Sequence, residues 1–429
     1  MDGQSMIATL IIADDLTGAA DCAVSCATAG ANTVVLLDLK ANLGGATAVS
    51  VDVNSRAMTA QEAGTAVTGA VQHLYSKSTR ILYHKIDSTL RGNWPSELAY
   101  IRQAATNVLG HAPLVIVAPA FPGAGRTTID GQVFVNGNPL GATALWKQAG
   151  LTGSGDLRAI LEDAAFRVGM VTLEQVALGS EALKTRLAKW VYAGCDVVVC
   201  DAQTQDDMLV VAAASRMLPG KPLWVGSAGL MRALVTTGEG EVVPSSAPTW
   251  AAAEGPILVV VGSASSVSHT QLDALAEEQG VMSLTILPSA LRESSALEQV
   301  QSYARTLDAA LGSGLDVAVA MRGEEINFQE GPQLAAALAE LIAPRLFKVG
   351  GLIVTGGETA RAILDRAGIS GLRMQGEIEP GTPIGVSIGS IAIPVITKAG
   401  AFGDRATLKR CRAILRGGRS DCSNLTMSE

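Results

Sequence analysis

The chain has 429 residues, of which 48% are hydrophobic and 17% charged, enough for two or three domains with sizeable cores. A formal net charge of −8 without any run of lysines or arginines disfavours a nucleic-acid partner. Neither a signal peptide nor an apolar span of about 18 residues is present, so we expect a cytoplasmic protein with no membrane partner.

Apolar runs alternate with stretches of helical spacing in the first part of the chain. In the first such stretch, small residues between Ala19 and Gly30 fall on one face of a helix. Cys22 and Cys26 belong to it. The spacing of the six cysteines fits no zinc motif, so we interpret these two as buried hydrophobic residues. Such alternation is typical of a parallel, doubly wound α/β sheet. The predicted strands are 7–13, 33–38, 48–53, 80–85, 114–118, 196–200 and 223–225.

The first strand ends on two adjacent acids, Asp14 and Asp15. One carboxylate suffices to cap the helix that follows from Gly18. The second then has no obvious structural duty, and ligands of open α/β sheets bind beyond the carboxyl ends of strands. We predict that Asp14 caps the helix or holds the loop and that Asp15 contacts a ligand.

Two further polar clusters follow strands. Loop 52–58 carries Arg56, whose guanidinium can bind a carboxylate or phosphate through paired hydrogen bonds, although a loop arginine is more often simply solvated. The segment after the fourth strand is denser. Helix capping would explain one hydroxyl residue in this segment. It does not explain why two cations, an acid and two hydroxyl residues occur together. It resembles a site for a small, highly polar anion. Its members are Lys85, Asp87, Ser88, Thr89, Arg91, Gly92 and Asn93.

The glycine- and proline-rich segment 118–140 predicts a long shaped loop with a hairpin. Segment 241–256 contains prolines without periodicity and predicts an interdomain linker. We therefore expect one α/β domain over 1–240, a second over 257–418 and a polar tail over 419–429. The predicted strands of the second domain are 257–261, 281–286, 316–321, 352–355, 384–388 and 392–397.

In the second domain, three glycine-containing turns follow strands, in the stretches VVVGSASSVSHTQL, LIVTGGETARAIL and ITKAGAFGD. Backbone N–H groups at such turns bind phosphates, and glycine allows close approach. One such turn is a weak signal, but three in one domain favour a nucleotide site. The sequence contains neither a P-loop motif nor a clean dinucleotide-binding fingerprint, which disfavours P-loop enzymes and Rossmann dehydrogenases.

Taken together, six stretches resemble the four-carbon acid sugar kinase family, in order and over almost the whole chain. They are IADDLTGAAD, KIDSTLRGN, APAFPGAGR, VGSAGL, VTGGET and KAGAFGD. The resemblance implies two α/β domains, each a mainly parallel sheet with helices on both faces. It also implies that the first domain binds a sugar acid, that the second binds ATP and that the active-site cleft lies between them.

The resemblance also assigns residues to the two ligands. Val53 and Asn54 depart from the threonine and glutamate that the family often has before Arg56. The 3-oxo-tetronate members of the family more often have serine and asparagine in place of Ala399 and Ala401, so the resemblance favours threonate or erythronate. The implied sugar-acid residues are Asp15, Arg56, Lys85, Asp87, Ser88, Thr89, Arg91 and Gly92, and the implied ATP residues are Ser263, Ser265, Gly356, Gly357, Glu358, Thr359, Gly400 and Gly403.

We therefore predict an ATP-dependent kinase for D-threonate or D-erythronate, with 3-oxo-tetronate kinase as the alternative within the family. Mg²⁺ is the expected ion on the phosphates, with protein ligands that the sequence does not identify. Asp15 or Asp87 is the candidate base, and Lys85 or Arg91 the candidate for steadying the transferring charge. An alternative of a different class is a non-catalytic sugar-acid sensor. The sequence is compatible with a homo-oligomer but does not decide the oligomeric state.

Overall fold

The computed structural model describes residues 6–148, 150–151, 153–238, 253–262, 265–292, 297–324 and 330–418. The chain divides into two compact units, Met1–Ser245 and Ser246–Glu429. The predicted tail and most of the predicted linker lie outside the described residues. No helix in the described ranges combines the length and the hydropathy that a bilayer-spanning segment needs.

The main sheet of the first unit is parallel, in the order β2-β3-β1-β4-β11-β5-β10-β9. Fully buried, β-branched runs form its central strands, as a sheet covered on both faces requires. The seven strands predicted for this half are present. The strands are β1 (Thr9–Ala13), β2 (Thr33–Leu36), β3 (Ala48–Asp52), β4 (Ile81–Lys85), β5 (Val115–Ala118), β9 (Val168–Val171), β10 (Val197–Cys200) and β11 (Leu223–Gly226).

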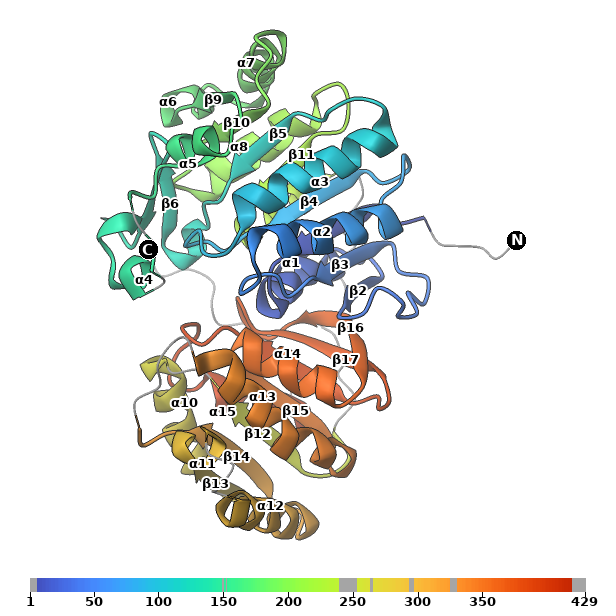
Figure 1. Cartoon of the computed structure of the whole chain (residues 1–429), viewed down its shortest axis with the longest axis vertical. Helices are drawn as coiled ribbons and strands as arrows, with labels where there is room; N and C mark the ends of the chain where they lie inside the picture. Colours follow the sequence, from blue (N-terminus) through green and yellow to red (C-terminus); the bar gives the residue numbers. More distant parts are fainter. Residues whose placement is uncertain are drawn as a thin grey trace. The chain divides into compact units, whose positions relative to one another are not determined.

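Helices cover both faces of this sheet (Figure 1), as predicted. Helices α2 and α3 pack together on one face, while α1, α9, α8 and α7 pack in succession on the other. Cys22 and Cys26 are buried on α1, as expected for small hydrophobic residues. The helices are α1 (Leu16–Thr28), α2 (Ala60–Leu74), α3 (Trp94–Leu109), α4 (Ala144–Gln148), α5 (Leu157–Asp163), α6 (Leu173–Val176), α7 (Ser180–Tyr192), α8 (Gln205–Arg216) and α9 (Ala228–Thr236).

The long loop after β5 contains the predicted hairpin. It begins with the short 3₁₀ turn η1 (Pro122–Ala124) and forms the antiparallel strands β6 (Arg126–Ile129), β7 (Gln132–Val135) and β8 (Asn138–Pro139), followed by η2 (Leu140–Ala142). Both hairpin turns place an Asx-Gly pair at positive φ, with Asp130 at 49° and Gly131 at 75° in the first. This conformation matches the twist of the flanking strands.

The sheet of the second unit has the order β13-β14-β12-β15-β18-β17-β16. Neighbours from β13 to β18 are parallel, whereas β18-β17 and β17-β16 are antiparallel, so the sheet is mainly parallel. The strands are β12 (Ile257–Val261), β13 (Val281–Ile286), β14 (Asp316–Met321), β15 (Gly351–Thr355), β16 (Ile369–Glu377), β17 (Pro383–Gly389) and β18 (Pro394–Lys398).

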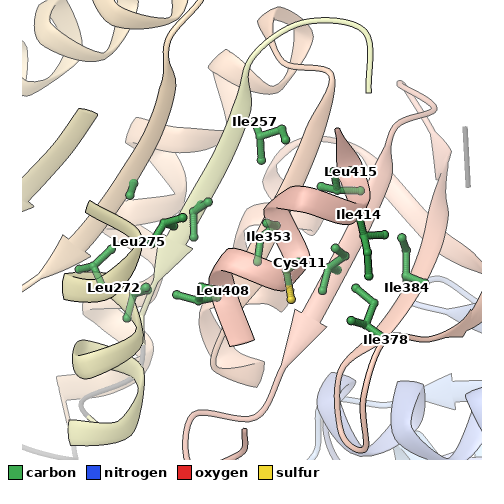
Figure 2. Packing of buried hydrophobic residues seen from close by; sticks show 14 of the residues in the cluster. Ile257, Leu272, Leu275, Ile353, Ile378, Ile384, Leu408, Cys411, Ile414 and Leu415 are labelled. Carbon is green, nitrogen blue, oxygen red and sulfur yellow. The ribbon is translucent and has the colours of Figure 1, made fainter. Parts of the chain in front are cut away.

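Helices α10 and α15 pack together on one face of this second sheet, and α11 to α14 on the other. Figure 2 shows side chains of α10 and α15 packed against the strands, with Leu272, Leu408 and Cys411 among the buried residues. The helices are α10 (Ser266–Ala276), α11 (Pro288–Arg292), α12 (Leu297–Gly312), α13 (Gly331–Ile342) with η5 (Ala343–Lys348), α14 (Gly357–Arg366) and α15 (Thr407–Leu415).

Strands β9 and β16 were not predicted, because each departs from an apolar run. Gly169 in β9 lies under the Trp190 ring, where a Cβ atom would come within 2.7 Å of the ring carbons. Glycine in a strand often marks such a close approach. Strand β16 mixes polar and apolar residues, and its register shifts twice, between Ile369 and Gly371 and between Met374 and Gly376.

In each unit the winding reverses between two adjacent strands. Strand β1 leads through α1 toward β2, while its neighbour β4 leads through α3 toward β5 on the opposite face. In the second unit, β12 leads through α10 toward β13, and its neighbour β15 leads through α14 toward β16. Open α/β sheets bind ligands at such reversals, outside the carboxyl ends of the strands.

Candidate active site

Strand order brings three separate loops of the first unit together. Since β3, β1 and β4 are neighbours, Arg56, the Asp14-Asp15 pair and the segment after Lys85 meet at one edge of the sheet. Arg56 contacts Asp14 through Nε to Oδ2 (2.7 Å) and Nη2 to Oδ1 (3.0 Å). Its Nη1 donates to Asp15 Oδ2 (3.0 Å), and its Nη2 lies 3.7 Å from Asp87 Oδ1. Arg56 therefore bridges three carboxylates of the protein itself.

The structure confirms one of the two roles predicted for Asp14, holding the loop, and gives the other, capping, to Asp15. Asp15, not Asp14, caps α1, since its Oδ1 accepts a hydrogen bond from the Gly18 amide (2.9 Å). The helix begins at Leu16, so the residue with extended cap geometry (φ −147°, ψ 158°) is Asp15. The Asp14 side chain is 3% exposed, against 18% for Asp15. Asp15 is thus both the cap and the more accessible acid, whereas Asp14 holds the Arg56 loop.

Asp87 is bound on all sides by its own segment. Arg91 donates to both of its oxygens through Nε and Nη2, each at 2.8 Å, and the Thr89 amide and hydroxyl donate to Oδ2. Burial opposes its charge, but Arg91 and Arg56 hold the pKa of Asp87 well below its usual range. A carboxylate so stabilised in its charged form is a weak proton acceptor, which leaves Asp15 as the better candidate base.

Replacing Asp87 with asparagine is expected to lower the free energy of unfolding at pH 7 by about 2 kcal/mol, because charged hydrogen bonds are lost. The lowered pKa of Asp87 makes its contribution present above about pH 4, the unfolded value, and lost as the pH falls through the folded value. The difference in stability between wild type and Asp87→Asn should therefore shrink in acid. Denaturant titrations between pH 3 and 7 measure it, and a difference that grows in acid would contradict the assignment.

The other predicted sugar-acid residues surround this cluster. Lys85 is buried and donates to the Ile86 carbonyl (2.9 Å), Ser88 is half-buried, and Thr89 is buried beside Asp87. Gly92 has φ +88°, and a Cβ atom there would lie 3.2 Å from Asp14 Oδ2. A side chain at this position would therefore be strained and would crowd the Asp14–Arg56 pair.

A buried network beneath the cluster was not predicted. Glu97, on α3, accepts from the Ser55 hydroxyl (2.5 Å) and lies 3.0 Å from His84 Nε2. Ser55 precedes Arg56 and His84 precedes Lys85, so one carboxylate fixes the approach of both cations. Burial opposes ionisation of Glu97, but its bond with His84 lowers its pKa overall. No sequence signal links residues 13 positions apart on different elements, which is why the pattern gave no hint of it.

In the second unit, the predicted glycine turns lie side by side because β12, β15 and β18 are parallel neighbours. The Gly262 amide donates to the Thr355 carbonyl (3.2 Å), and the Gly356 amide donates to the Lys398 carbonyl (3.0 Å). Gly356 has φ +93° and immediately precedes α14. The first amides of α14 have no partner within the helix and form a natural site for an anion.

The predicted ATP residues occupy different positions around these turns. Ser265 precedes α10, and Glu358 is exposed on the first turn of α14. Thr359 is buried, and a Cβ atom on Gly262 would collide with it, so its side chain joins two turns. Gly403 is exposed at φ +81°. Ser263 lies outside the described residues.

Lys398 gives the third turn its shape, a role that the sequence analysis missed. Its side chain is fully buried and its Nζ donates to the carbonyls of Ala399 (2.9 Å), Gly400 (3.3 Å) and Phe402 (3.0 Å). Burial lowers the pKa of Lys398 to about 8. The Gly400 carbonyl also accepts from Ser268 of α10 (2.8 Å), which fastens the last turn to the first.

The two units match different family models, one for a sugar-binding domain and one for a nucleotide-binding domain. Residues 9–234 match the model of a sugar-binding N-terminal domain, and residues 258–408 match that of a nucleotide-binding C-terminal domain. The chain belongs to the four-carbon acid sugar kinase family. It is 42% identical to a D-threonate kinase of Cupriavidus necator over 93% of this chain and 96% of that protein.

Other relatives cover the chain as fully. A D-threonate kinase of Salmonella typhimurium is 31% identical over 94% of this chain and 97% of that protein. A D-erythronate kinase of Heliobacterium modesticaldum is 29% identical over 94% and 95%. A crystal structure of a protein from Salmonella typhimurium LT2 has the same fold as this chain. The TM-score is 0.81, and the two are 24% identical over 95% of this chain and 99% of that one.

Proposed function

We propose that this kinase transfers phosphate from ATP to a four-carbon sugar acid, with D-threonate as the first candidate. Three D-threonate kinases are relatives at 42%, 31% and 30% identity, whereas five 3-oxo-tetronate and D-erythronate kinases among the relatives are 25–29% identical. This ranking supports D-threonate, with D-erythronate and 3-oxo-tetronate as the alternatives.

One structural observation supports the proposal most strongly. Each unit has a winding reversal, and the chemistry beyond the strands differs between them. The first unit has acids, cations and hydroxyls that suit a hydroxylated acid. The second has glycine turns and the start of α14, which suit phosphates. Two such sites in one chain are what a kinase needs for its acceptor and its donor.

Within the acceptor site, we assign Asp15 as the base that takes the proton of the attacking hydroxyl. Its Oδ1 bonds Gly18 and its Oδ2 bonds one nitrogen of Arg56, which leaves lone pairs on both oxygens. Asp14 is too buried for this role, and Asp87 is held by Arg91. Lys85 and Arg91 lie beside the acids and supply positive charge near the acceptor.

Kinases bind ATP together with a divalent cation, and the proposed ATP site of the second unit fits such an ion. Magnesium is held mainly by phosphate oxygens and water, with one or two protein carboxylates. The exposed Glu358 carboxylate, on the first turn of α14, is the protein oxygen that we assign to it. Bound Mg²⁺ would neutralise charge that develops on the phosphates. The protein itself contributes the amides of the turns and the rigid backbone set by Lys398.

Release of ADP from ATP and Mg²⁺ in the presence of single four-carbon acids tests the proposal. We expect turnover with D-threonate and a lower kcat/KM with D-erythronate and 3-oxo-tetronate. Turnover confined to 3-oxo-tetronate would replace the substrate assignment. Binding of the acids by calorimetry without any ADP release would instead identify a sugar-acid sensor and would defeat the kinase assignment.

A further inference from the structure

The cations predicted to receive the substrate's carboxylate are already occupied by the protein. Arg56 is bound to Asp14 and Asp15, and Arg91 makes two hydrogen bonds to Asp87. Burial lowers the pKa of Lys85, but Cys22 and the carboxylates of Asp15, Asp14 and Asp87 raise it overall, so the charge of this cation is compensated as well. An incoming carboxylate that approached either arginine would meet the negative charge of these acids. Discrimination between an acid and a neutral polyol therefore requires a cation whose charge the protein leaves uncompensated.

Arg126 has this property. It begins β6, in the motif after the carboxyl end of β5, and its Nη1 donates only to a neutral group, the Ala124 carbonyl (2.6 Å). Its Nε is buried without a hydrogen-bond partner. Among the described residues no carboxylate forms an ion pair with it. Burial lowers the pKa of Arg126, and Asp87 and Arg91 are the two charged groups that affect it.

The loop before Arg126 fixes its position. Arg126 and Phe121 exchange backbone hydrogen bonds in both directions, at 2.9 and 3.0 Å. Gly125 closes the turn at φ +68°, and a Cβ atom there would collide with Asn136 of the hairpin. Ser227, which caps α9 after β11, donates to the Ala120 carbonyl (3.2 Å). An arginine on such a constrained loop loses little entropy when it binds an anion.

The distance across the sheet also fits the substrate. The order β4-β11-β5 places the loop after β5 two strands away from the loop after β4, about 10 Å at the usual strand spacing. A four-carbon chain with a hydrogen-bonding group at each end spans such a separation. One end would then meet Arg126, while the hydroxyls would face Asp15 and the segment after β4.

We propose that Arg126 binds the carboxylate of the sugar acid and sets the preference of the enzyme for acids over neutral polyols. The proposal rests on the function proposed above and adds the group that recognises the acid. A guanidinium with an unpaired Nε and a free Nη2 presents two adjacent donors, the geometry that a carboxylate accepts. Other residues recognise the hydroxyls, so a substitution of Arg126 should weaken recognition of the carboxylate without affecting recognition of the hydroxyls.

The test compares Arg126→Gln, Arg126→Lys and the matched control Arg167→Gln, with the acid and a neutral four-carbon polyol as substrates. Arg167 lies in the same unit, is exposed and pairs with Asp196. We expect Arg126→Gln to raise KM for the acid about 10- to 100-fold, since charged hydrogen bonds are lost. KM for ATP and kcat/KM for the polyol should stay unchanged. Arg126→Lys should recover part of the loss, and Arg167→Gln should match wild type.

Several outcomes would overturn the proposal. An unchanged KM for the acid would do so, as would an equal loss of kcat/KM for acid and polyol. A fall in kcat at constant KM would move Arg126 to the transferring phosphoryl group. If wild type releases no ADP with any acid, the proposed function fails instead. Calorimetry of the acid with wild type and Arg126→Gln then decides the carboxylate site on its own, and equal affinities would reject it.

Discussion

Asp15→Asn is expected to lower kcat about 10²- to 10⁴-fold, the usual contribution of a general base. Asparagine keeps the size of the side chain and can still cap α1 through its oxygen, so the helix should start at the same residue. What it loses is the charge needed to take the hydroxyl proton. KM for the acid should change far less than kcat, because hydrogen bonds to the hydroxyls remain. Steady-state kinetics with the preferred acid measures both.

The neighbouring Asp14→Asn is the matched control, since it makes the same chemical change one residue away. Asp14 is buried and makes two hydrogen bonds to Arg56, so its loss should appear mainly as stability, about 3 kcal/mol for a broken buried pair. Unchanged kcat and KM in Asp15→Asn would show that both acids are structural.

The sequence predicted most strands of the parallel sheets, because these strands are buried on both faces and read as apolar runs. Strand β1, for example, ends in four consecutive fully buried residues, Leu10 to Ala13. The prediction missed strands whose sequence is determined by contacts with other parts of the protein or by an irregular register. Gly169 makes room for Trp190 in β9, and the irregular register of β16 breaks its pattern. Such contacts are formed by residues distant in the sequence, and the sequence of one strand does not reveal them.

For the site, the sequence predicted which residues gather but not how they pair. Arg56 and the Asp14-Asp15 pair are about 40 positions apart, and their contact follows from β3 lying beside β1. The pairing matters for the chemistry, because Arg56 forms ion pairs with the protein's own acids. The role of Arg126 depends on the same result, since its charge matters only once the other arginines are neutralised.

Of the two roles predicted for Asp14, holding the loop is confirmed, whereas capping was wrong for a local reason. The sequence placed the start of the first helix at Gly18, because Leu16, Thr17 and Gly18 were interpreted as a turn after the acids. In the structure the helix starts two residues earlier, at Leu16, which moves the cap from Asp14 to Asp15. Helix boundaries are uncertain by about this much in sequence-based prediction. Two residues decided which carboxylate caps the helix.

Gly357→Val is expected to raise KM for ATP about 10- to 100-fold, because amides that bind phosphate oxygens through charged hydrogen bonds become shielded. Gly357 is the first residue of α14 and is not among the glycines with positive φ, so valine fits its backbone. KM for the acid should stay unchanged, since we propose that the acid binds in the first unit. Gly312→Val is the matched control, because Gly312 ends α12 and a Cβ atom added there would have no neighbouring atom within 4 Å. Equal increases in both Michaelis constants, with a lower melting temperature than the control, would show misfolding and would remove the turn from the ATP site.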